Sequence, residues 1–289
     1  MNARVAAVRT IAGFALRESL RRRVFLVVLV LSAAFLGLYA LGAAQAFHDA
    51  DELAIGNSFG VEPRVIVGAT MLGLAMFGTL FLGAILAVFL TLGVVRGDAD
   101  RGLLQPVVVR PVGRSLLLVA RFLGAGTVCG AYVGALFAAT VLITGVAGGW
   151  WPDRVIGPGL ALAGAACVIC ALSLLGSVAL GTTANGIAVF MVFGAGLVAG
   201  LLGQIGEALD SSTLNTVSGV ATWALPFEAL YQGALSSVTA DTVGFTKLAI
   251  DLGPFGGAED AGPLLWPWVL LYLAVVGLVA ARGFARRDL

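Results

Sequence analysis

The run VIVGATMLGLAMFGTLFLGAILAVFLTLGVV, residues 65–95, contains no charged side chain over 31 residues. A helix that crosses a bilayer needs about 20 mostly apolar residues, so this run is long enough to span a membrane. At about 1.5 Å per residue it would reach about 46 Å, against a hydrocarbon core of about 30 Å. We therefore expect a spanning helix that tilts, kinks or projects beyond the bilayer.

Five further charge-free runs lie at 24–47, 122–150, 155–180, 186–203 and 264–281. The composition agrees with them, because 60% of the 289 residues are apolar, only 11% are charged and the mean hydropathy is +1.02. Soluble domains carry about 45–50% apolar and about 25% charged residues, and disorder requires high net charge with low hydrophobicity. The sequence therefore predicts an all-α integral membrane protein with six transmembrane helices over residues 24–289.

The charged residues are divided between the two predicted faces. All but three of the 17 lysines and arginines lie before the first span, between spans two and three, or after span six; the three exceptions are Arg64, Arg154 and Lys247. All but four of the 16 acidic residues lie on the other face. The positive-inside rule makes the basic face cytoplasmic, so both termini are predicted to be cytoplasmic.

Residues 1–23 are predicted to form an amphipathic helix on the inner leaflet. Apolar residues recur there at helical spacing, and the arginines would meet anionic headgroups. The polar residues of this interfacial helix are Arg17, Glu18, Arg21, Arg22 and Arg23. The alternative is a first span that simply begins early and carries the positive-inside signal. Ala44-Gln45-Ala46 has the form of a signal-peptidase site, but the preceding segment and the apolar run are longer than usual for a signal peptide.

The chain lacks the motifs of the common hydrolytic sites. It contains one lysine, Lys247, in GFTKL (244–248), so it has no Gly-Lys-Ser/Thr phosphate loop. A serine or threonine nucleophile would need a nearby base, and the only histidine of the chain is His48, in a predicted outer segment. Cys167-x-x-Cys170 has the spacing of a metal or redox pair. A zinc site needs about four ligands, however, and the single histidine lies elsewhere on the outer side, so we expect free buried cysteines. We predict no enzyme activity, no cofactor, no metal and no nucleic-acid partner in this chain.

Glycines at four-residue spacing mark two predicted spans. They are Gly126, Gly130 and Gly134 in the third span and Gly196 and Gly200 in the fifth. Small residues at this spacing let helix backbones approach closely in lipid, so we interpret both stripes as helix-packing seams, with a substrate path as the alternative. The outer segment 204–263 is long enough for its own small structure, and 214–235 within it reads as helical with an interruption at Pro226.

The inner connection 96–121 is the largest predicted on the cytoplasmic face. It reads RGDADRGLLQPVVVRPVGRSLLLVAR, a charged turn followed by an apolar stretch and a proline near the start of a new helix. The stretch 103–109 is too apolar for a freely solvated loop, so we expect it on the membrane surface or in a groove of a partner.

This connection resembles that of the permeases of type-2 ATP-binding-cassette exporters. Those proteins carry an acidic residue, Arg-Gly-Thr-Leu, an apolar stretch and Arg-Pro-Val-Ser-Arg between spans two and three; here the match is DRGLL (100–104) and RPVGR (110–114). LQP (104–106), RESLRRR (17–23), PFEA (226–229) and RRDL (286–289) are similar to the branch of nitrous-oxide-reductase maturation permeases. The chain departs from the pattern at Leu103, where Thr is usual, and at Gly113, where Ser is frequent.

The resemblance implies a subunit of the bacterial cytoplasmic membrane that pairs with a second permease, identical or different, and with two cytoplasmic ATPase subunits that hold ATP and Mg. The connection would then be the coupling element that docks in a cleft of the ATPase. The coupling residues it implies are Asp98, Asp100, Arg101, Gly102, Leu103, Leu104, Gln105, Arg110, Pro111 and Arg114. The alternative for the charged ones is a solvated positive-inside signal.

Two other functions stay open at this point. None of the six runs contains an internal carboxylate, which counts against a proton- or sodium-coupled secondary carrier. A membrane scaffold or sensor subunit that transports nothing is the third possibility. The transported substrate does not follow from the residues.

Overall fold

The structure, a computed structural model, describes residues 23–54, 63–92, 114–239 and 262–286. Within these ranges every regular element is a helix. The helices are α2 (Arg23–Ala54), α3 (Pro63–Thr91), α6 (Arg114–Gly148), α7 (Ile156–Ala179), α8 (Thr182–Ala208), α9 (Ser212–Ala224), α10 (Pro226–Thr239) and α12 (Leu265–Ala285). All except α9 and α10 are long and apolar enough to cross a membrane, which gives 6 candidate spans. The chain is therefore an all-helical, multi-pass membrane protein, as the sequence predicts.

The helices extend beyond several of the predicted spans. α2 continues past the predicted end at residue 47 to Ala54, and α8 covers Thr182–Ala208 where 186–203 was expected. α6 begins at Arg114, so the last part of the predicted connection 96–121 is already helical. Hydrophobic runs mark where a charge first occurs, whereas a helix ends where its backbone hydrogen bonds end, so the two sets of limits differ.

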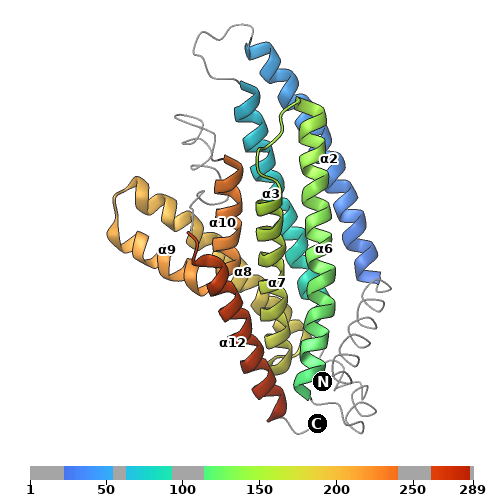
Figure 1. Cartoon of the computed structure of the whole chain (residues 1–289), viewed down its shortest axis with the longest axis vertical. Coiled ribbons are helices and arrows are strands. Elements are labelled where there is room, and N and C mark those ends of the chain that lie inside the picture. Colours follow the sequence, from blue (N-terminus) through green and yellow to red (C-terminus); the bar gives the residue numbers. More distant parts are fainter. Residues whose placement is uncertain (1–22, 55–62, 93–113, 240–261, 287–289) are drawn as a thin grey trace.

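α3 and α7 form the centre of the bundle. They run antiparallel to α2 and α6, and α7 packs against α3, α6, α10 and α12 (Figure 1). Their buried faces consist mainly of small and medium apolar side chains such as Ala84, Ala87, Ala165 and Ala166, which allow close helix approach. The end of α3, the start of α6, the start of α2 and the end of α12 all lie in the lower half of Figure 1.

Two side-chain hydrogen bonds join α2 to α6. The hydroxyls of Ser32 and Tyr132 lie 2.5 Å apart, and those of Tyr39 and Thr144 also lie 2.5 Å apart. Ser32, Tyr39 and Thr144 are buried. In lipid such polar contacts specify which face of one helix meets the next, because apolar side chains gain little by leaving apolar lipid.

α8 and α9 form an arm on one side of the bundle. Figure 1 shows the second half of α8 running outward and α9 returning beside it. Within the arm, the Ser218 hydroxyl donates to the carbonyl of Ala199 at 2.9 Å. At its inner end α8 is tied to α7, because the Asn185 amide donates to the carbonyl of Ser173 at 2.9 Å.

α10 lies inside the bundle rather than in a separate outer structure. A break at Leu225 separates it from α9, as the interruption predicted at Pro226 requires. α10 then packs most extensively against α7 and also against α3 and α12. Within the outer segment 204–263, which is long enough for a small structure of its own, the apolar residues of 226–239 are thus buried against the spanning helices.

Candidate functional site

The predicted coupling residues lie almost entirely outside the described residues. This holds for 98–111, and of the set only Arg114 is described, as the first residue of α6. The interfacial helix 1–23 also lies outside them, except for Arg23, which begins α2. The docking role of these residues and the interfacial position of the first helix stay predictions.

A buried polar cluster on α10 is the chemically richest part of the described structure. Glu228 and Tyr231 are each 0% exposed, and Gln232 is 4% exposed. The Gln232 amide donates to Oε1 of Glu228 at 3.3 Å. Oε2 of Glu228 and the hydroxyl of Tyr231 have no hydrogen-bond partner among the described residues. Buried polar atoms are normally paired, so these two orphans mark the cluster as a candidate functional site.

Burial determines the protonation state of this cluster. Glu228 sits in the first turn of α10, where the partial positive charge of a helix N-terminus favours a carboxylate. Removal from water acts more strongly and raises the pKa of Glu228 to about 8, although the hydrogen bond from Gln232 lowers it. Burial, followed by the nearby Glu228 charge, also raises the pKa of Tyr231. Burial therefore favours the neutral form of both groups.

The glycines of α8 make room for α10. A Cβ at Gly200 would lie 2.5 Å from Oε1 of Glu228 and 2.8 Å from Nε2 of Gln232. A Cβ at Gly196 would lie 2.5 Å from the ring of Phe227. These distances are far below ordinary van der Waals contact, so α10 can occupy its position only because α8 has no side chain at either place.

The glycines of α6 have looser surroundings. A Cβ at Gly126 would lie 3.7 Å from Sγ of Cys167, and one at Gly130 would lie 3.8 Å from Cβ of Ala163. A Cβ at Gly134 would meet nothing within 4 Å. α6 and α7 do pack together along much of their length, and the Cys167 thiol points to the carbonyl of Gly126 at 3.6 Å.

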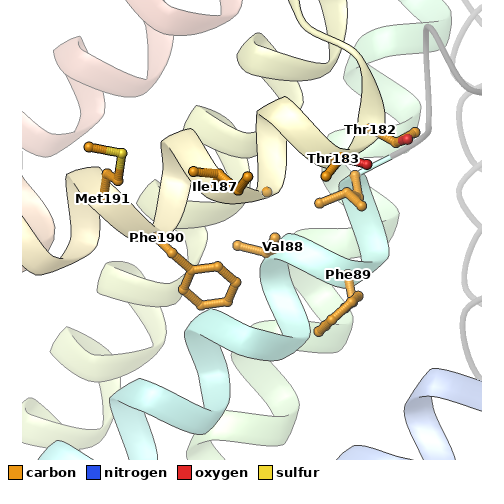
Figure 2. Close-up of a pocket in the computed structure, with 9 residues that line it drawn as sticks. Val88, Phe89, Thr182, Thr183, Ile187, Phe190 and Met191 are labelled. Carbon is orange, nitrogen blue, oxygen red and sulfur yellow. The ribbon is translucent and has the colours of Figure 1, made fainter.

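An apolar pocket of about 500 Å³ lies between the end of α3 and the start of α8 (Figure 2). It is lined by Val88, Phe89, Leu92, Thr182, Thr183, Gly186, Ile187, Phe190 and Met191. Its volume is in the range of ligand sites, about 300–1,000 Å³. The two threonine hydroxyls are its only polar side-chain groups, so the pocket can hold an apolar group such as a lipid chain but offers no acid or base.

The described structure also contains a second pocket and three cysteines. A pocket of about 480 Å³ between α6, α7 and α12 has an apolar lining that includes Phe122 and Leu174. Cys129, Cys167 and Cys170 are free thiols at the contact of α6 and α7. Among the described residues no group of three or more His, Cys, Asp or Glu side chains is placed to hold a metal.

Sequence reasoning missed Glu228 as a candidate site residue because it counted carboxylates only within the six runs. Glu228 was assigned to an outer segment, where a charged residue is ordinary. A signal was available: Glu228 and Gln232 are four residues apart, as are Leu230 and Ala234, which is the pattern of a helix with polar and apolar residues on defined faces. Their burial on both faces depends on α8 and α7, which local sequence does not reveal.

No family model matches the chain, and no curated protein matches it.

Proposed function

We propose that this chain is the transmembrane permease subunit of an ATP-binding-cassette exporter in the bacterial cytoplasmic membrane. The chain itself binds no ATP in this proposal; a separate cytoplasmic ATPase hydrolyses it, and the connection 96–121 couples the two. A second permease, identical or different, completes the membrane part.

The observation that carries the proposal is the place of the family-like motif in the sequence, between the helices α3 and α6. DRGLL (100–104) and RPVGR (110–114) belong to the segment between α3 and α6. α3 ends and α6 begins in the lower half of Figure 1, where α2 also begins and α12 ends. The segment connects α3 and α6, which pack against each other, and α3 also contacts α2 and α7. A force that a partner applies to this connection would therefore act on several helices of the bundle.

Charge supports the same interpretation. All but three of the basic residues belong to the predicted cytoplasmic face, and the single lysine leaves the chain without a phosphate loop. A transporter with this composition needs an energy source in another chain or in an ion gradient.

The test is charge reversal in the motif, with a matched control on the opposite face. Arg101→Glu and Arg110→Glu should each reduce copurification of an ATP-binding-cassette ATPase encoded beside this gene, whereas Arg154→Glu should not. Arg154 is a suitable control because it is exposed between α6 and α7, at the other end of those helices. Copurification that is equal in all three variants, or a gene neighbourhood without such an ATPase, contradicts the proposal.

A secondary carrier is the second candidate function, and one observation favours it. The missing intramembrane carboxylate was the reason to set it aside, and Glu228 on α10 is a fully buried carboxyl within the bundle. Buried carboxyls of this kind carry coupling protons in many transporters. A chain that never associates with an ATPase, and whose Glu228→Gln variant loses proton-driven transport, would favour the carrier.

A further inference from the structure

Among the described residues, Glu228 is a buried acid without a counter-charge. Its Oε1 accepts the long hydrogen bond from Gln232, and its Oε2 has no partner among the described residues. Burial of an uncompensated carboxylate is unfavourable, so the group is expected to neutralise by holding a proton.

The helices that surround α10 supply no basic group to neutralise it. α10 contacts α3, α7, α8, α9 and α12. The titratable or charged side chains of those helices are Arg64 of α3, Cys167 and Cys170 of α7, Glu207 of α8, and Tyr272 and Arg282 of α12; α9 has none. Arg64 lies at the start of α3 and forms an ion pair with Asp51, and Arg282 lies in the last turn of α12. Within α10, Tyr231 is the titratable group whose pKa responds to the charge of Glu228.

The carboxyl is covered on one side by the arm. Gly200 of α8 lies directly over Oε1 of Glu228 and Nε2 of Gln232. α8 and α9 pack chiefly against each other, and α8 contacts α10 and α3 only sparsely. α8 is also packed against α7, but few contacts join it to α10, so a displacement of the α8–α9 arm away from α10 would break few contacts with that helix and would admit water to the carboxyl.

We propose that Glu228 is a proton-binding site inside the bundle, closed by Gly200 of α8 and opened when the α8–α9 arm moves away from α10. In the closed state Glu228 is the neutral acid. On opening, its O–H bond breaks, the electron pair stays on the carboxylate and the proton passes to water. Closing requires the reverse transfer. The site does not depend on an ATPase, so its test is independent of the proposed function.

Infrared difference spectroscopy of the purified full chain in lipid nanodiscs tests the proton directly. The C=O stretch of a protonated acid should be present at neutral pH and should disappear at alkaline pH with a midpoint near the Glu228 pKa of about 8. It should be absent from Glu228→Gln and unchanged in Asp210→Asn. Asp210 is a matched control, because it is exposed and has a positive φ of 49°, which Asn also adopts. A wild-type chain without this band, or a band that persists in Glu228→Gln, overturns the proposal.

The movement of the arm is tested by native tryptophans. Trp268 of α12 donates its indole N–H to the carbonyl of Trp223 of α9 at 2.9 Å, and their rings lie 6.1 Å apart. Raising the pH should change the tryptophan fluorescence of the wild type, and this change should be lost in Glu228→Gln and reduced in Trp223→Phe. A pH response that is the same in Glu228→Gln overturns the coupling of proton release to the arm.

A measurement on the unmodified chain covers the case in which Glu228→Gln does not fold. Dicyclohexylcarbodiimide is an apolar reagent that adds to protonated carboxyls, and peptide mass analysis locates the adduct. We expect labelling at Glu228 at neutral pH that declines as the pH rises, with no labelling at Asp210. Equal labelling of Glu228 at neutral and alkaline pH, or no labelling at either, contradicts the proton site.

Discussion

The glycine stripes of α6 and α8 share a four-residue spacing but have different surroundings. In α8, Gly196 and Gly200 face Phe227 and the Glu228–Gln232 pair, at distances that exclude any side chain. In α6, Gly126 faces a sulfur at 3.7 Å and Gly134 faces nothing within 4 Å. The spacing therefore indicates that one face of a helix lacks side chains. Whether a side chain could be accommodated there depends on how closely the partner helix approaches.

The strongest test of this difference is Gly200→Leu. The new side chain would collide with Oε1 of Glu228 and Nε2 of Gln232, displace α10 and break their hydrogen bond. Overpacking typically lowers the free energy of unfolding by about 1–3 kcal/mol, and we expect a loss at least this large, measured as a lower midpoint of thermal unfolding. Gly194→Leu is the control on the same helix, because a Cβ at Gly194 meets nothing within 4 Å. Equal effects of the two variants would show that α10 does not lie against α8.

Gly196→Ala should have the next largest effect. The added methyl lies 2.5 Å from the Phe227 ring, which is fully buried and stacks on Phe193 with ring centres 5.7 Å apart, so the ring has little room to move. We expect the free energy of unfolding to fall by about 1–3 kcal/mol, measured by thermal unfolding. Phe227→Leu in the same chain should recover part of the loss, as neighbouring sites are not additive. Purely additive losses in the double-mutant cycle would contradict this contact.

Gly134→Ala should act in the opposite direction. Nothing opposes a Cβ at this position, and replacement of glycine by alanine within a helix gains roughly 0.5–1 kcal/mol. The thermal unfolding midpoint should rise slightly. A clear fall would mean that a partner, such as a second copy of the chain, covers this part of α6.

Gly126→Ala should have the smallest effect. The new methyl would touch Sγ of Cys167 at ordinary van der Waals distance, so helix propensity and a slight crowding should nearly cancel. The unfolding midpoint should stay close to that of the wild type. When Cys167→Ala is added to Gly126→Ala, the crowding is removed and the unfolding midpoint should rise through the higher helix propensity of alanine. A large fall of the midpoint in Gly126→Ala alone would show that α6 and α7 lie closer than described.

Much of the fold follows from the sequence because each spanning run must exceed the thickness of a bilayer. The charge-free runs locate all six candidate spans, and Pro226 correctly marks the break between α9 and α10. The position of α10 does not follow, since a 14-residue helix is too short to produce a spanning signal. Its burial depends on Gly196 and Gly200 of another helix.

The candidate site was predictable only in part. Gly200 was identified by its spacing, but the polar pair that it faces was not, because the sequence places Glu228 among ordinary acidic residues of an outer segment. The coupling residues Arg101 and Arg110 were predicted by resemblance to a family, and they lie outside the described residues. Their role depends on a partner, which the fold of one chain does not contain.

ATP turnover in proteoliposomes is the most direct test of the proposal that this chain is driven by a separate ATPase through 96–121. The neighbouring ATPase should be measured alone, with the wild-type chain, with Arg110→Glu and with Arg154→Glu. We predict that the wild type and Arg154→Glu change its turnover equally and that Arg110→Glu leaves it at the value of the ATPase alone. An unchanged turnover with the wild-type chain, or the same response to Arg110→Glu as to the wild type, would contradict the account.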